Sequence, residues 1–238
     1  MEKLKSKKRL LVILLVCLAV ILTLTISFFV YVSDYYRADA VAQMTLEMDD
    51  HIEAIGNDII LSPTTPSDTG LVFYPGAKVE AIAYLPILEK LKQNGVTCVL
   101  VKMPFNMAIF DVNAADSIFE QFPEIKNWYI GGHSMGGAMA SSYAAKHQDT
   151  VDGLILLGAY IYGDYPPEKA LTIYGTFNSD LEEKMPYTEN RIVIDGGNHA
   201  QFGNYGSQKG DPPATITSDE QQNIAVSAIL DFIFNEAH

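Results

Sequence analysis

The feature that most restricts the fold of this chain is the regular alternation, after Pro66, of short apolar runs with longer segments of helical period. Most of these runs lack the apolar–polar alternation of a strand with one face in water, so helices should cover both faces. Strands that alternate with helices through short connections predict a mostly parallel, doubly wound α/β sheet. Six strands are predicted, at residues 71–74, 97–101, 128–131, 153–157, 171–174 and 191–194.

Four helices are expected between and after these strands, at residues 86–95, 114–122, 135–147 and 218–235. Pro86 suits a first helical turn, and Gly95 suits the end of the same helix. Thr217 and Glu220 have the spacing of a capping box at the start of the last helix. Only 13 residues separate the fourth predicted strand from the fifth, which leaves no room for a cap domain over the sheet.

Residues 10–32 form an uncharged, proline-free apolar run of 23 residues. As a helix this run is about 35 Å long, which exceeds the roughly 30 Å hydrocarbon core of a bilayer. Residues 1–9 carry five of the chain's cations, and cations beside a span favour the cytoplasmic side. We therefore expect a single-pass protein of the cell membrane, with a cytoplasmic N-terminus and the body outside.

Two other interpretations of the apolar run stay open. A cleaved signal peptide has a shorter apolar region followed closely by small residues, whereas Ala40-Val41-Ala42 comes about ten residues too late for that pattern. A buried core helix is the second alternative. On the membrane interpretation, residues 1–9 are a cytoplasmic segment, 33–57 a juxtamembrane helix or linker, and 58–238 one globular domain.

The segment most informative about chemistry is G-x-S-x-G, formed by Gly132, Ser134 and Gly136 between a predicted strand and a predicted helix. A serine on such a sharp turn adopts a strained backbone that lifts its hydroxyl above the sheet. The chain approaches itself closely on both sides of the turn, which only glycine permits. Ser134 is therefore the expected nucleophile, and the N–H of Met135 is expected to bind a developing oxyanion. A serine flanked by glycines through chance is the alternative.

The expected general base is His199, which follows the last predicted strand in a glycine-rich loop. That loop offers the mobility that a catalytic imidazole needs. The other histidines are less suited because they adjoin the serine, lie in the linker, end a helix or end the chain: His133, His51, His147 and His238. Neighbours on a sharp turn point apart, so His133 is expected to be a packed residue. A polar loop histidine without a catalytic role is the alternative for His199.

These residues make the chain similar to the α/β-hydrolases, and within them to the group named for dienelactone hydrolase (carboxymethylenebutenolidase). It looks closest to a bacterial membrane-anchored branch of that group. The resemblance covers residues 57–236 and rests on residues 74–80, on 102–104, on the serine turn, and on 196–203 together with Gln221 and Gln222. Dienelactone hydrolases use a cysteine nucleophile, so the resemblance does not extend to their substrate.

The resemblance implies a catalytic acid between the nucleophile and the histidine, just after the fifth predicted strand. Asp180 is the first carboxylate in that stretch, and it would hold the imidazole in the useful tautomer. The branch's acid pattern resembles G-[ST]-x-D-G, and counting from Gly175 places Asn178 in the acid position instead. An amide there would stabilise the imidazolium less strongly. A surface loop aspartate without a role is the alternative for Asp180.

The predicted chemistry is acyl transfer to water. Besides Met135, the expected oxyanion donor is the N–H of Ala77, in the loop after the first predicted strand, where Gly76 permits close approach of the chain. His199 takes the proton of Ser134, whose oxygen attacks an ester, thioester or lactone carbonyl and forms an acyl-enzyme that water hydrolyses. A small or accessible acyl compound is the expected substrate. A non-catalytic surface binding or scaffold protein on the same fold, and an acyltransferase, are the alternatives.

Charge and composition argue against other classes of function. The net charge is −13, and the remainder without residues 1–9 carries 11 cations and 28 anions, so it would repel nucleic acid. Cys17 lies in the apolar run and Cys98 in a predicted strand, so no disulfide framework or cysteine metal site is expected. The sequence contains no HExxH motif, Cys/His cluster or phosphate-binding glycine loop with a lysine, so no metal or organic cofactor is expected.

Overall fold

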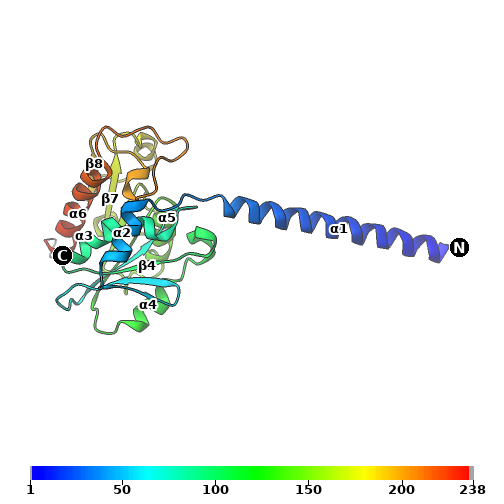
Figure 1. The fold of residues 1–238 in the computed structure, drawn as a ribbon, viewed down its shortest axis with the longest axis horizontal. Helices are drawn as coiled ribbons and strands as arrows, with labels where there is room; N and C mark the ends of the chain where they lie inside the picture. Colours follow the sequence, from blue (N-terminus) through cyan, green and yellow to red (C-terminus); the bar gives the residue numbers. More distant parts are fainter. Residues whose placement is uncertain (1, 236–238) are drawn as a thin grey trace. The chain divides into compact units, whose positions relative to one another are not determined.

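The structure, a computed structural model, describes residues 2–235 as two compact units that divide between Tyr35 and Tyr36. The first unit contains the helix α1 (Glu2–Ser33) (Figure 1). Its stretch Lys7–Ser33 contains an 18-residue window with a mean hydropathy of 3.0 and is long and apolar enough to cross a membrane. This length and composition fit a membrane span, and they equally fit a signal sequence.

The second unit is built on an eight-stranded sheet with the order β1-β2-β4-β3-β5-β6-β7-β8. From β4 to β8 all neighbouring strands are parallel, whereas β1 and β2 form an antiparallel hairpin that joins β4 in the antiparallel sense. The predicted mostly parallel α/β sheet is therefore confirmed. The strands are β1 (Ile52–Ile55), β2 (Asp58–Leu61), β3 (Thr69–Tyr74), β4 (Thr97–Val101), β5 (Asn127–His133), β6 (Gly153–Leu157), β7 (Ala170–Gly175) and β8 (Arg191–Ile194).

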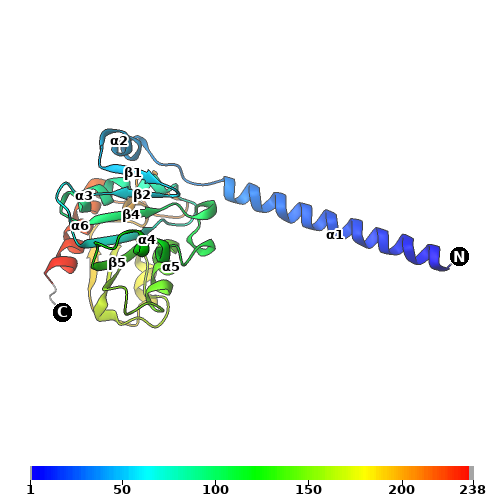
Figure 2. The same cartoon turned by 90° about the horizontal axis from the view of Figure 1, so that it is seen from below.

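Helices cover both faces of the sheet in two layers (Figure 2). One layer contains α2 (Ala40–Met48), α3 (Leu85–Gln93) and α6 (Ser218–Phe234), and the other contains α4 (Ala115–Gln121) and α5 (Met135–Ala144). In β3, Leu71 and Phe73 belong to the first core, whereas Val72 and Tyr74 belong to the second. All four side chains are buried, which explains why the strand sequences lack apolar–polar alternation.

The six predicted strands and four predicted helices are present, with small differences at their ends. The connection from β6 to β7 covers residues 158–169 and contains only the short turn η4 (Pro167–Lys169). Within the described residues, therefore, no cap domain is inserted between these two strands.

The globular body begins earlier than the sequence indicated, because the segment 33–57, expected to be a juxtamembrane helix or linker, contains α2 and β1. Both belong to the compact unit that starts at Tyr36. α2 buries Ala42 fully, and the Asp39 side chain caps its start by accepting from the Ala42 N–H. β1 and β2 have four residues each and are joined through Gly56, which has positive φ. Neither strand was predicted from the sequence, because this hairpin is stabilised by pairing between its own strands and with β4.

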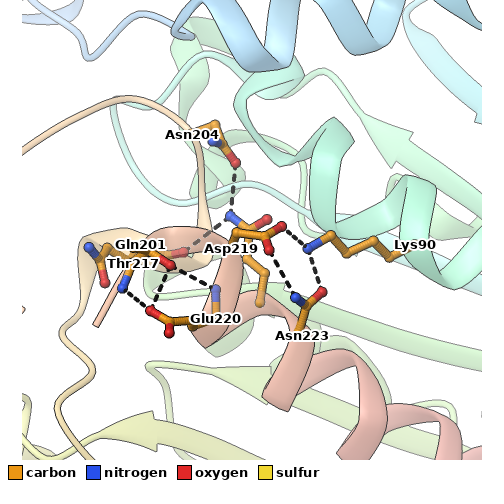
Figure 3. Close-up of polar contacts among 8 residues, drawn as sticks. Lys90, Gln201, Asn204, Thr217, Asp219, Glu220 and Asn223 are labelled. Carbon is orange, nitrogen blue, oxygen red and sulfur yellow. Dashed lines mark hydrogen bonds and ion pairs between the residues drawn. The ribbon is translucent and has the colours of Figure 1, made fainter. Parts of the chain in front are cut away.

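The start of α6 is fixed by its own cap and by α3 (Figure 3). Thr217 and Glu220 form the predicted capping box, in which each side chain accepts from the other residue's backbone N–H. Lys90 of α3 donates to both Asp219 and Asn223 at 2.6 Å. The ion pair is exposed at its Asp219 end and contributes little stability alone. Together these contacts position the helix whose buried glutamines reach the loop after β8.

Candidate active site

Ser134 lies at the turn between β5 and α5, at the carboxyl edge of the parallel strands. Its backbone has φ 54° and ψ −121°, which is a strained conformation for a residue with a side chain. A Cβ atom at Gly136 would overlap the carbonyl oxygens of Tyr74 and Pro75, and one at Gly132 would also meet the Tyr74 carbonyl. The close packing of β3 against the turn therefore requires both glycines of G-x-S-x-G.

The hydroxyl of Ser134 is available for chemistry. The Ser134 N–H donates to the carbonyl of Leu157 at 3.0 Å, which fixes the turn against β6. The residue is partly exposed, and its hydroxyl forms no hydrogen bond within residues 2–235. A hydroxyl that is held in place by its backbone and left unpaired can approach a substrate carbonyl.

His199 lies in the loop after β8, at the start of the short turn η6 (Ala200–Phe202). Gln221 of α6 is fully buried and binds both backbone groups of Asn198, accepting from the N–H at 3.0 Å and donating to the carbonyl at 2.8 Å. The Asp211 carboxylate accepts from the N–H of His199 at 3.1 Å and from that of the next residue at 2.7 Å. The backbone on both sides of His199 is thus held by side chains from elsewhere in the fold.

The imidazole of His199 is half-buried and contacts the ring of His133, with 4.5 Å between the ring centroids. Its Nδ1 lies 3.0 Å from Nδ2 of Asn178. Burial lowers the pKa of His199 below the ordinary value for an imidazole, and the nearby charge of Asp211 offsets part of that lowering. The ring is therefore mostly neutral at pH 7, which is the state that a general base requires.

Ser134 and His199 come from distant parts of the chain and adjoin the same segment at the end of β6. Leu157 binds the amide of Ser134, and a Cβ added to the next residue, Gly158, would lie 2.9 Å from Nδ1 of His199. His133, the residue before the serine, also binds the carbonyl of His199 at 3.0 Å. Within the described residues no hydrogen bond joins the serine hydroxyl to the His199 ring. Such bonds often tighten only when substrate is present.

Buried hydrogen bonds connect Gly76, Tyr84, His133 and the carbonyl of His199, and we call them the inner hydrogen-bond chain. The carbonyl can only accept, so His133 donates to it through Nε2–H at 3.0 Å. Burial, followed by the neighbouring His199 ring, lowers the pKa of His133 well below its usual value. The ring is therefore neutral, and its Nδ1 accepts from the Tyr84 hydroxyl at 2.8 Å. The Tyr84 oxygen in turn accepts from the Gly76 N–H at 3.1 Å.

The two amides expected to form the oxyanion hole have no partner in the described part of the chain. The N–H of Met135 is the first of α5, where helical amides lack intrahelical acceptors. The N–H of Ala77 follows Gly76, whose own N–H is bound to Tyr84, and precedes Lys78, whose N–H donates to the carbonyl of Asn106 at 2.7 Å. The loop after β3 is therefore fixed on both sides of the Ala77 amide.

Of the two candidates for the acid position, Asn178 lies against the His199 ring and Asp180 does not. The Asp180 carboxylate is exposed, and it forms no hydrogen bond or ion pair among the described residues. Within that same part of the chain, the Asn178 side chain is hydrogen-bonded only to His199. A half-turn of the side-chain amide would therefore place Oδ1, an acceptor, where Nδ2, a donor, now lies. With Oδ1 toward the ring, the amide accepts from Nδ1–H and leaves Nε2 free to take a proton.

A hollow of about 440 Å³ opens beside His199. Its lining comes from the loops after β7 and β8: Phe177, Asn178, Asp180, His199, Gln208, Lys209, Gly210, Asp211 and Pro212. Ser134 is not part of this lining, so the hollow adjoins the side of the site that holds the base. Three charged side chains in the lining make the space polar, and it gives solvent access to that side.

Two residues of this site, Tyr84 and Asp211, were not singled out from the sequence. Tyr84 lies just before α3 and belongs to no sequence motif. Asp211 lies in a loop, 12 residues after His199. His133 was expected only to pack, and it is indeed fully buried, but both of its ring nitrogens are hydrogen-bonded. The one signal in the sequence was His133 itself, because a buried histidine needs a hydrogen-bond partner for each ring nitrogen. Among the described residues, no cluster of His, Cys, Asp or Glu could hold a metal ion.

Residues 70–223 match the sequence model of a known family, described as the Alpha/beta hydrolase family. The matched segment contains the serine turn, the loop after β7 and the loop that carries His199. Comparison of the sequence with curated proteins gives no match.

Solved structures with a similar fold include a dienelactone hydrolase from Anabaena variabilis, which is 16% identical with a TM-score of 0.51 and covers 76% of this chain and 96% of its own. A soluble variant of monoglyceride lipase from Saccharomyces cerevisiae, bound to a substrate analog, is 10% identical with a TM-score of 0.53, covering 79% and 95%. A ferulic acid esterase from Streptomyces cinnamoneus is 17% identical with a TM-score of 0.51, covering 72% and 68%. At these identities the similarity shows a shared fold.

Proposed function

Because the chain belongs to the alpha/beta hydrolase family, we propose that it is a serine hydrolase that cleaves an ester-like bond through an acyl-enzyme. Ser134 is the nucleophile, His199 is the general base, and the N–H groups of Met135 and Ala77 bind the oxyanion. One observation carries this proposal: a strained serine has an unpaired hydroxyl, the unpaired amide of Met135 follows it, and His133 before it contacts the neutral imidazole of His199. A serine placed only by packing would need none of these features.

The proposed reaction has two balanced halves. Nε2 of His199 takes the hydroxyl proton of Ser134 while Oγ bonds to the acyl carbon, and the carbonyl electron pair moves to the oxygen held by the two amides. The imidazolium then gives its proton to the leaving alcohol or thiol as the acyl-enzyme forms. Water attacks the acyl-enzyme with His199 again as base, and the acid and the free serine are released.

The proposed substrate class follows from the short connection between β6 and β7 and from the hollow beside His199. The connection from β6 to β7 carries no inserted domain within the described residues, and the hollow beside His199 is polar. Such a site favours small or accessible carboxylic esters, thioesters or lactones over long acyl chains that need an enclosed apolar tunnel.

In this proposal Asn178 occupies the position of the triad acid. Its amide oxygen would accept from Nδ1–H of His199 and so select the tautomer in which Nε2 is the base. The distance of 3.0 Å between the Asn178 side chain and Nδ1 of the ring supports this role. The side-chain amide also has no other hydrogen bond in the described part of the chain. An amide orients the ring without adding a negative charge to it.

We further propose that α1 anchors the enzyme in the cell membrane as a single span, with the N-terminus in the cytoplasm and the hydrolase body outside. The length and hydropathy of Lys7–Ser33 support a span. The five cations within residues 1–9 support the orientation.

A fluorophosphonate probe tests the hydrolase proposal, because it bonds only to an activated serine and releases fluoride. The full chain in detergent should be labelled at Ser134. Labelling should disappear in Ser134→Ala and fall by at least roughly a hundredfold in His199→Ala, since the base contributes that much to nucleophilic attack.

The matched control is Ser227→Ala, which removes an exposed serine from α6 and should leave labelling unchanged. A folded wild-type chain that takes up no probe would contradict the proposal and would favour a binding or scaffold role for the same fold. Labelling that persists in Ser134→Ala would contradict the assignment of the nucleophile.

A further inference from the structure

The loop that carries His199 is held by a carboxylate that no step of the proposed reaction uses. Asp211 follows His199 in sequence and folds back onto the start of η6. Its two oxygens accept from the backbone N–H groups of His199 and Ala200, at 3.1 and 2.7 Å. Each oxygen has its own donor, so the carboxylate is fixed in orientation as well as in position.

The ring of His199 itself has an uncharged partner. Its Nδ1 faces the amide of Asn178, and Asp180, the carboxylate nearest to that amide in sequence, is exposed and unbound among the described residues. Asp211 and Asn178 line the same hollow beside the ring. The orienting group and the nearby fixed anion are therefore two different residues.

We propose that Asp211 is a positioning residue that fixes the backbone of His199 and also supplies the negative charge that stabilises the protonated ring. This inference rests on the proposed hydrolase function and divides the task of one triad acid between two side chains. Asn178 sets the tautomer through a hydrogen bond. Asp211 acts on the charge that develops when the ring takes the proton of Ser134.

The other titratable groups around the ring do not supply that charge. His133 contacts the ring and is neutral, because burial keeps its pKa well below the usual value. Asp180 and Lys209 line the hollow with opposite charges and are both exposed, so solvent screens them more strongly than a fixed carboxylate. Behind His133, the Tyr84 hydroxyl stays protonated because burial raises its pKa. The Asp211 charge, by contrast, raises the pKa of His199 against the effect of burial.

The test is the titration of His199 in the full chain, followed by the NMR chemical shifts of the imidazole in detergent micelles and assigned with His199→Gln. In Asp211→Asn the midpoint should move to lower pH, because a neutral amide no longer favours the protonated ring. The matched control is Asp195→Asn, which removes the same charge from an exposed position in the loop after β8 and should leave the midpoint in place.

A second variant separates charge from geometry. Asp211→Glu keeps the charge but changes its reach, so its midpoint should stay closer to the wild type than that of Asp211→Asn, even if the loop shifts. In Asp211→Asn the rate of fluorophosphonate labelling on its high-pH plateau should fall roughly tenfold. The acidic limb of the pH profile of labelling should move to lower pH, as the titration midpoint of His199 does.

An unchanged midpoint in folded Asp211→Asn would overturn the proposal, as would equal shifts in Asp211→Asn and Asp195→Asn. The titration needs no turnover, so it is read separately from the hydrolase proposal. Absence of labelling in the wild type would remove the proposed function, whereas absence of a midpoint shift would remove only the role of Asp211.

Discussion

At the scale of single residues, the site depends on which side chains are left without partners and which are fully bound. The hydroxyl of Ser134 and the amides of Ala77 and Met135 have no hydrogen bond in the described part of the chain. In contrast, both ring nitrogens of His133 and both oxygens of Asp211 are bound. In the proposed hydrolase, the bound groups fix the geometry and the unbound groups would contact the substrate.

The two candidates for the acid position can be separated by a pair of alanine variants. Asn178→Ala removes the only side chain hydrogen-bonded to Nδ1 of His199 among the described residues, so kcat/KM for a short acyl ester should fall by at least roughly tenfold. Asp180→Ala should change kcat/KM less than twofold or so, because an exposed, unbound charge acts weakly. The reverse order of effects would assign the acid position to Asp180.

The sequence did not decide whether Asn178 or Asp180 lies beside the His199 ring, because the path of the loop after β7 determines it. Residues 175–180 read as one loop in which a carboxylate at position 180 and an amide at position 178 are equally allowed. Which of them meets the ring depends on how the loop turns after β7. In the structure the Asn178 N–H donates to the Gly175 carbonyl at 2.9 Å, and that tight turn places the amide, not the carboxylate, beside His199.

At the scale of secondary-structure elements, the inner hydrogen-bond chain joins the loop after β3 to the loop after β8. The first loop carries the Ala77 amide and the second carries His199. Between them stand Tyr84, from the turn η1 (Ala81–Tyr84), and His133, from the end of β5. The inner hydrogen-bond chain thus fixes the loop with the Ala77 amide relative to the loop with His199.

Removing one hydroxyl from this chain should cost more stability than its contact area suggests. Tyr84→Phe would leave both the Gly76 N–H and Nδ1 of His133 unpaired in the interior, so the free energy of unfolding should fall by about 1–3 kcal/mol. Chemical denaturation of the full chain in detergent measures the change. Tyr162→Phe is the matched control because Tyr162 is 55% exposed, and its effect should stay within about 0.5 kcal/mol. Equal effects of the two variants would show that the buried hydroxyl is not needed.

The elements themselves were predictable to different degrees from the sequence. β3 to β8 and the helices between them have long enough apolar patterns to be recognised locally, and they were found. β1 and β2 were not, because this hairpin acquires its stability by pairing between its own strands and with β4. α2 lies where a juxtamembrane helix or linker was expected, without defined ends. Single bonds of the inner hydrogen-bond chain join residues up to 66 positions apart, so no local pattern could reveal it.

At the scale of the whole molecule, the chain combines an acidic body with a basic start. The body carries a large excess of anions, whereas residues 1–9 carry five cations next to the apolar helix. A membrane anchor with its N-terminus in the cytoplasm agrees with the five cations beside the helix, and the acidic charge of the body has little influence on this orientation. A cleaved signal sequence would give the same orientation but would release the body from the membrane.

The two native cysteines allow this topology to be tested against a low background. Cys98 is fully buried, and burial raises the pKa of its thiol, so it should not react with a maleimide. Cys17 lies inside the apolar span Lys7–Ser33, where a charged reagent does not enter. The variant Ser207→Cys adds a thiol at an exposed position of the body. Intact cells that express it should be labelled by a membrane-impermeant maleimide, whereas cells with the unaltered chain should not.

The labelled protein also reports whether the anchor is retained. If α1 stays attached, the label should sediment with the membrane fraction at the full 26.2 kDa mass. Label in the medium, on a chain shortened by the apolar helix, would identify α1 as a signal sequence. Labelling that requires lysis of the cells would instead place the body in the cytoplasm, because the charged reagent then reaches position 207 only after the membrane is broken. Each outcome assigns one of the three topologies that an apolar helix of this length permits.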